Sequence, residues 1–97
     1  MLIVAGHFTI APEDRDAFIA GRRESMASTR KENGCLEYVM AADPIDDTRI
    51  ILFERWADQA AFDAHMAAMQ SGPRPSGPAP TGMSVEIYDI AGTRSFG

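Results

Sequence analysis

The sequence has little of what most recognisable catalytic or metal sites require. It contains one cysteine and two histidines among 97 residues, so it has no internal disulfide and no His/Cys cluster with metal-ligand spacing. Its late glycines alternate with prolines and precede a strand instead of a helix, which is the wrong context for a phosphate-binding loop. The cysteine, Cys35, follows a predicted helix C-terminus whose dipole disfavours a thiolate, so we interpret it as structural. A single cysteine favours a reducing compartment, and we expect a cytoplasmic protein.

The chain is also poor in positive charge and in long apolar runs. Nine Lys and Arg residues against fourteen Asp and Glu residues give a formal net charge of −5, whereas nucleic acids and anionic membranes both attract basic surfaces. No apolar stretch approaches the roughly 20 residues of a membrane-spanning helix, and the apolar start of the chain lacks the basic leader of a signal peptide. We therefore expect neither a nucleic acid nor a membrane as a partner.

What the sequence does contain is a clear succession of periodic segments. Four of them have the alternating or continuous apolar pattern of strands: 2–10, 34–41, 49–56 and 85–90. Segments 12–31 and 58–70 have apolar residues at three- and four-residue spacing, which predicts helices. Gly34 is expected to end the first helix and Asp58 to cap the second. The order β-α-β-β-α-β predicts a ferredoxin-like α+β fold, with a four-stranded antiparallel sheet and two helices on one face.

At this length we expect one domain, residues 1–97, with two irregular segments. Residues 71–82 hold four of the six prolines, so they form neither a helix nor a central strand, and they are either a connection or a flap over a pocket. Residues 91–97 form a C-terminal tail. The strand 49–56 is apolar on both faces, and because the helices cover only one face of the sheet, we expect a second copy of the chain to cover the other.

His65 is the sharpest candidate for a catalytic group. It lies on the apolar stripe of the second helix, where a half-buried imidazole that faces a cavity can act as a general base. The alternative is a histidine at the edge of the core that bonds to a backbone carbonyl or to Glu54. Arg22 would steady a substrate oxyanion. The full predicted substrate pocket is aromatic, apolar or cationic: Phe18, Arg22, Trp56, Phe62, Met66 and Met69.

Several segments together resemble the antibiotic-biosynthesis-monooxygenase-like family of dimeric α+β barrels. They are residues 6–12, residues 32–38 with the pattern E-x-G-C-x-x-Y, the E-x-W pattern of Glu54 and Trp56, and the a-x-H pattern that ends at His65. The resemblance covers roughly residues 1–70 and is weak afterwards. It implies a homodimer whose two sheets pack face to face, with a small pocket between sheet and helices in each subunit.

The resemblance also implies an activity. Members of this family oxidise phenolic or quinol-type compounds without metal, flavin or haem, because the substrate anion reacts with dioxygen and the protein supplies deprotonation and a dry pocket. We therefore expect a monooxygenase that acts on a small aromatic or quinol-like compound and dioxygen, needs no cofactor and uses His65 as its base or orienting group. Leu52 and Phe62 stand where polyketide-oxidising members have asparagine and tyrosine, which favours an alternative, a non-catalytic dimeric small-molecule-binding or stress-response domain. An isomerase of a small metabolite is a third possibility.

Overall fold

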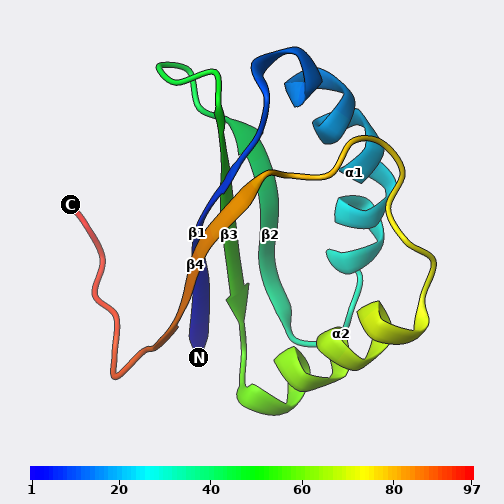
Figure 1. The fold of residues 1–97 in the computed structure, drawn as a ribbon. Coiled ribbons are helices and arrows are strands. Elements are labelled where there is room, and N and C mark those ends of the chain that lie inside the picture. The colour runs from blue at the N-terminus through cyan, green and yellow to red at the C-terminus, as the bar shows by residue number, and fades with distance from the viewer.

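The computed structural model describes residues 1–97. The chain forms one antiparallel sheet of four strands in the order β2-β3-β1-β4, and both α-helices lie on the same face of it (Figure 1). The predicted ferredoxin-like α+β fold is confirmed. The elements are β1 (Leu2–Thr9), the 3-10 helix η1 (Pro12–Asp14), α1 (Arg15–Thr29), β2 (Cys35–Ala42), β3 (Arg49–Trp56), α2 (Gln59–Ser71) and β4 (Gly82–Asp89).

Two signals in the sequence set the helix ends that surround the candidate site. Gly34 adopts a φ of 82°, a conformation that glycine reaches without steric cost, so the chain turns sharply from α1 into β2. A Cβ at Gly34 would also collide with Ala61 of α2, so glycine lets α2 approach this turn. Asp58 caps α2, since its carboxylate accepts a hydrogen bond from the backbone N–H of Ala61 at 2.8 Å.

The predicted bounds are wrong at the first helix and at the last strand. The expected helix 12–31 is divided, because Pro12–Asp14 form a 3-10 helix and the α-helix begins at Arg15. The last strand begins at Gly82 and not at residue 85, because pairing with β1 extends to Thr9. The backbone N–H of Thr81 donates to the carbonyl of Thr9 at 2.8 Å and closes this end of the ladder. The irregular segment is therefore shorter than expected.

The core lies between the helices and one face of the sheet. Along β3, buried residues alternate with half-buried ones, because successive side chains of a strand point to opposite faces. The opposite face of the sheet is covered by no helix (Figure 1). Neither α1 nor α2 has the length and the apolar composition that a membrane-spanning helix requires. The buried apolar residues are Leu2, Val4, Ile10, Phe18, Tyr38, Met40, Ile50, Leu52, Trp56 and Phe62.

The Pro/Gly-rich segment does not fold across the sheet. It leaves the end of α2, runs beside α1 and then joins β4 (Figure 1). Two glycines allow the close approach: a Cβ at Gly21 would collide with the carbonyl of Ser76, and a Cβ at Gly77 would lie 3.0 Å from the carbonyl oxygen of Ala17. Residues 72–76, which we name the α1 loop, therefore form one wall of a groove beside α1.

Candidate functional site

The candidate site is a cluster of polar and aromatic side chains buried where α2 and the turn after α1 meet β2 and β3. His65 of α2 is only 2% exposed, so it is more deeply buried than the sequence suggested. Its ring contacts Trp56 of β3 at a centroid distance of 4.7 Å, and the ring of Tyr38 of β2 edge-on at 5.5 Å. The imidazole is thus held on two sides by aromatic rings that come from the sheet.

The third neighbour of His65 is Glu32, which lies in the turn between α1 and β2. Nδ1 of His65 is 3.0 Å from Oε1 of Glu32. When Nδ1–H donates to this carboxylate, Nε2 carries the lone pair, which is the arrangement of a general base oriented by an acid. Sequence reasoning did not single out Glu32 as a site residue. Its only signal was its place as the first residue of the E-x-G-C-x-x-Y pattern.

Glu54 is a second carboxylate in this cluster and is itself buried, at 6% exposure. Its Oε1 accepts a hydrogen bond from the indole N–H of Trp56 at 2.9 Å. Burial raises the pKa of the Glu54 carboxyl, and the Trp56 hydrogen bond and the nearby His65 oppose this shift only in part. The expectation that His65 could pair with Glu54 is wrong, because His65 pairs with Glu32 and Glu54 pairs with Trp56.

Burial also favours the neutral forms of two further titratable side chains at neutral pH, those of Tyr38 and Cys35. Burial raises the pKa of the Tyr38 hydroxyl, and the charge of Glu54 raises it further. Burial also raises the pKa of the Cys35 thiol, with added contributions from the carboxylates of Glu32 and Glu54. A thiol that resists deprotonation is a poor nucleophile, which agrees with the structural role expected for Cys35.

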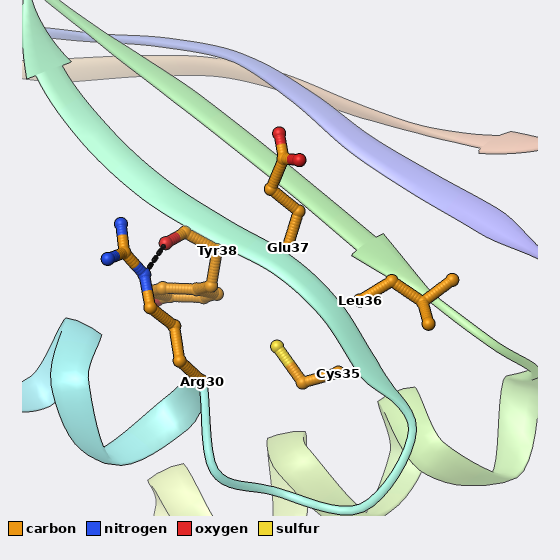
Figure 2. Close-up of a pocket in the computed structure, with 5 residues that line it drawn as sticks. All are labelled: Arg30, Cys35, Leu36, Glu37 and Tyr38. Carbon is orange, nitrogen blue, oxygen red and sulfur yellow. Dashed lines mark hydrogen bonds between the residues drawn. The ribbon is translucent and has the colours of Figure 1, made fainter.

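A small cleft of about 210 Å³ lies between the end of α1 and the start of β2 (Figure 2). Its lining comes from Arg30 and residues 35–38. The side chain of Arg30 closes one side, because its Nε donates to the backbone carbonyl of Tyr38 at 2.8 Å. No residue of the predicted substrate pocket lines this cleft.

A larger groove of about 510 Å³ lies between α1, α2 and the α1 loop. Glu32 lines it, and the Glu32 side chain is 31% exposed. Glu32 is therefore the member of the buried cluster that reaches the groove, whereas His65 is not part of its lining. The groove is also lined by charged, hydroxyl-bearing and thioether side chains: Glu24, Ser25, Ser28, Met69 and Arg74. No group of three or more His, Cys, Asp or Glu residues is placed to hold a metal ion.

The structure brings two of the predicted pocket residues next to His65. Trp56 contacts the imidazole directly, and Phe62 contacts Trp56 at a ring centroid distance of 6.2 Å. Both are buried, Trp56 completely. The aromatic side of the predicted pocket thus exists as a packed layer beneath α2.

Phe18 and Arg22 form a separate pair on α1. The Arg22 guanidinium lies 4.5 Å from the centre of the Phe18 ring, a cation–π contact. Phe18 is fully buried and also contacts Phe8 of β1 at 5.7 Å between ring centroids. Burial lowers the pKa of the Arg22 guanidinium, and its Nε has no hydrogen-bond partner. Arg22 thus retains a buried donor without a partner, but it lines neither the cleft at the start of β2 nor the groove between α1 and α2.

Met66 and Met69 of the predicted pocket do not lie on the buried side of α2. They are 40% and 53% exposed. Only Phe62 and His65 of α2 are buried, so the second half of this helix does not pack on the sheet. Met69 lines the groove and Met66 does not.

Comparison with known proteins agrees with this fold. The protein-family description that matches residues 1–71 is antibiotic biosynthesis monooxygenase. The uncharacterised protein sll1783 of Synechocystis is 33% identical over 64 residues, which are 66% of this chain and 44% of that protein. The chain therefore spans less than half the length of this curated relative.

Solved structures match over nearly the whole chain. A provisionally assigned antibiotic biosynthesis monooxygenase from Deinococcus radiodurans has a TM-score of 0.78 and 18% identity, over 99% of this chain and 98% of that one. Another from Chloroflexus aurantiacus has a TM-score of 0.70 and 27% identity, over 99% and 98% of the two chains. By the match to its first 71 residues and by its fold, the chain belongs to the antibiotic biosynthesis monooxygenase family.

Proposed function

We propose that this protein is a monooxygenase that oxidises a small phenolic or quinol-like compound with dioxygen, without a cofactor, and that the His65–Glu32 pair supplies its base. The observation that carries the proposal is the 3.0 Å contact between Nδ1 of the buried His65 and the Glu32 carboxylate. Membership of the family supports the reaction class. An imidazole and a carboxylate in contact can together take a proton from a phenol and return it later.

The proposed reaction balances without an external reductant. The pair removes the hydroxyl proton of the phenol, and the electron-rich phenolate ring forms a carbon–oxygen bond with dioxygen. The same ring carbon then loses its hydrogen as a proton while the O–O bond breaks. One oxygen atom stays as the new carbonyl of a quinone, and the other leaves as water. The aromatic layer of Trp56 and Phe62 keeps water away from the imidazole of the pair, which favours reaction of the anion with dioxygen over its reprotonation.

A non-catalytic small-molecule-binding domain is the second candidate, and one observation favours it. Trp56 and Phe18 are completely buried, so neither presents a ring face to a ligand. Leu52, also buried, adds no polar group to the site. A domain with this interior would bind a compound in the groove and leave it unchanged.

We also propose that two copies of the chain pair through the sheet face opposite the helices. That face carries Ile3, Ala5, Ile51 and Phe53, which are half-buried although no element of the same chain covers them. A contiguous apolar surface of this kind is typical of a protein interface. A two-fold symmetric pair would cover it in both copies at once.

Oxygen uptake with a panel of hydroquinones and catechols tests the activity. We expect the wild-type protein to consume oxygen and form quinone absorbance, and His65→Ala to lower kcat by about 10²–10⁴-fold, the usual contribution of a positioned base. His7→Ala is the matched control, because His7 is the other histidine and points to the sheet face opposite the cluster, beside Ile51; sedimentation verifies that this variant associates as the wild type does. Circular dichroism verifies that each variant is folded.

Binding of a quinol without oxygen uptake would favour the second candidate. Oxygen uptake that His65→Ala leaves unchanged would exclude the assigned base.

A further inference from the structure

The two members of the His65–Glu32 pair differ in their exposure to solvent. His65 is 2% exposed and is covered by the rings of Trp56 and Tyr38. The Glu32 side chain is 31% exposed and lines the groove of about 510 Å³. A compound in this groove therefore meets the Glu32 carboxylate first, and the imidazole lies behind that carboxylate.

The groove has the chemistry to bind a neutral compound that carries several hydroxyl groups. The lining holds two carboxylates, Glu24 and Glu32, and one guanidinium, Arg74, and Ser25 and Ser28 add hydroxyl groups from α1. Carboxylates accept hydrogen bonds from hydroxyl groups and repel other anions. Met69 adds an adaptable apolar surface on the α2 wall, which suits an aromatic ring. A catechol-like compound fits this lining better than an aromatic acid.

The width of the groove depends on a contact that does not involve the pair. The α1 loop reaches α1 because Gly21 has no side chain, and a Cβ there would collide with the carbonyl of Ser76. Gly77, with a φ of 90°, lies against the carbonyl of Ala17 in the same contact. Gly21→Ala would therefore displace the loop wall without touching His65 or Glu32.

We infer that the groove between α1, α2 and the α1 loop is the ligand site, and that Glu32 is the catalytic residue that accepts the hydroxyl proton of a catechol-like ligand. His65 is then a positioning residue, which acts by donating its Nδ1–H to the Glu32 carboxylate. The role of Glu32 as a base rests on the proposed function, whereas the location of the ligand in the groove does not.

Calorimetry and NMR of the labelled protein test the site by measuring the binding of catechol under nitrogen. We expect catechol to shift the resonances of Ser25 and Ser28, and benzoate to bind at least tenfold more weakly. Glu32→Gln and Gly21→Ala should each weaken catechol binding by at least tenfold. Glu13→Gln is the control, because Glu13 is an exposed carboxylate in η1 outside the groove.

The variant His65→Asn tests whether His65 is itself the base or positions Glu32 as the base. In the variant His65→Asn, the amide Nδ2–H would stand close to where the imidazole Nδ1–H stands, but the amide provides no base. If His65 positions Glu32, His65→Asn should retain at least tenfold more oxygen-uptake activity than His65→Ala, while Glu32→Gln should be as inactive as His65→Ala. Equal, low activity of His65→Asn and His65→Ala would overturn the assignment of Glu32 as the base.

The experiments distinguish a wrong ligand site from a wrong proposed reaction. Catechol affinity that Glu32→Gln and Gly21→Ala leave unchanged, or no binding of catechol at millimolar concentration, would overturn the groove as the ligand site. Oxygen uptake by the wild type would still support the monooxygenase in that case. Conversely, groove binding that depends on Glu32 without oxygen uptake for any quinol would keep the site and refute the proposed reaction.

Discussion

The strands β3 and β4 both pair with β1, both contain eight residues, and differ in almost everything else. Ile50 and Trp56 of β3 are completely buried, whereas Met83 and Ile87 of β4 are 69% and 55% exposed. These side chains lie on the same face of the sheet, since their register through β1 is in phase. Burial in this molecule therefore depends on what lies above a strand, and not on how apolar the strand is.

The difference in helix cover between the two halves of the sheet also determines where titratable side chains are buried. α1 and α2 cover β2 and β3, and the chain then leaves α2 along α1 without crossing β4 (Figure 1). A carboxylate in the covered half, such as Glu54, loses its hydration and must find a partner. Glu86 and Asp89 on β4 are exposed and need none. The titratable cluster thus belongs to the half of the sheet that excludes water.

The largest expected effect comes from truncating the same residue type on the two strands. Ile50→Ala should lower the free energy of unfolding by about 2–5 kcal/mol, because it leaves a cavity in a packed core. Ile87→Ala should change it by less than about 0.5 kcal/mol, as exposed substitutions usually do. Urea unfolding of both variants measures the difference. A concentration-dependent loss of more than about 1 kcal/mol in Ile87→Ala would instead show that a partner covers β4.

A smaller effect is expected on the uncovered face of the sheet. Phe53→Asp places a charge in the apolar surface that we propose as the contact between two copies, so it should weaken self-association at least tenfold. Ala67→Asp makes the same change of charge on the exposed side of α2 and should leave association unchanged. Sedimentation velocity at micromolar concentration measures both. A wild-type protein that sediments as a monomer would refute the paired arrangement.

Periodicity predicted the covered half of the fold better than the exposed half. The bounds of β3 agree with the predicted strand 49–56, and Asp58 caps α2 as expected. β4 begins earlier than predicted, because its first residues gain their conformation from pairing with Thr9 of β1. A ladder between residues so far apart leaves no pattern in the local sequence.

The candidate site could be predicted only in part, and the reason is again tertiary. The helical period placed His65 and Phe62 on one face of α2, and that face is buried. It did not identify Glu32, which is 33 residues from His65 and approaches it only through the turn at Gly34. The prediction also grouped Met69 with Trp56 in one pocket, but Met69 is exposed, because the second half of α2 does not pack on the sheet.

The smallest expected effect concerns the buried carboxyl of Glu54. Burial raises its pKa above the ordinary value of 4.5, so the folded protein binds this proton more tightly than the unfolded chain does. The stability that Glu54 contributes is therefore fully present below pH 4.5 and is lost as the pH rises through its pKa in the folded protein. Glu54→Gln removes this loss and keeps an oxygen that accepts the Trp56 N–H bond.

We accordingly expect Glu54→Gln to melt a few degrees above the wild type at pH 7, and this gain to shrink as the pH falls toward 4. Glu86→Gln on the exposed strand β4 makes the same change in net charge and should alter the melting temperature little at either pH. Calorimetric scans at the two pH values compare the strands directly. A lower melting temperature for Glu54→Gln at pH 7 would mean that the ionised carboxylate stabilises the fold, against the direction of its pKa shift. The covered half would then tolerate a buried charge at neutral pH, and the contrast with β4 would not lie in the cost of removing a carboxylate from water.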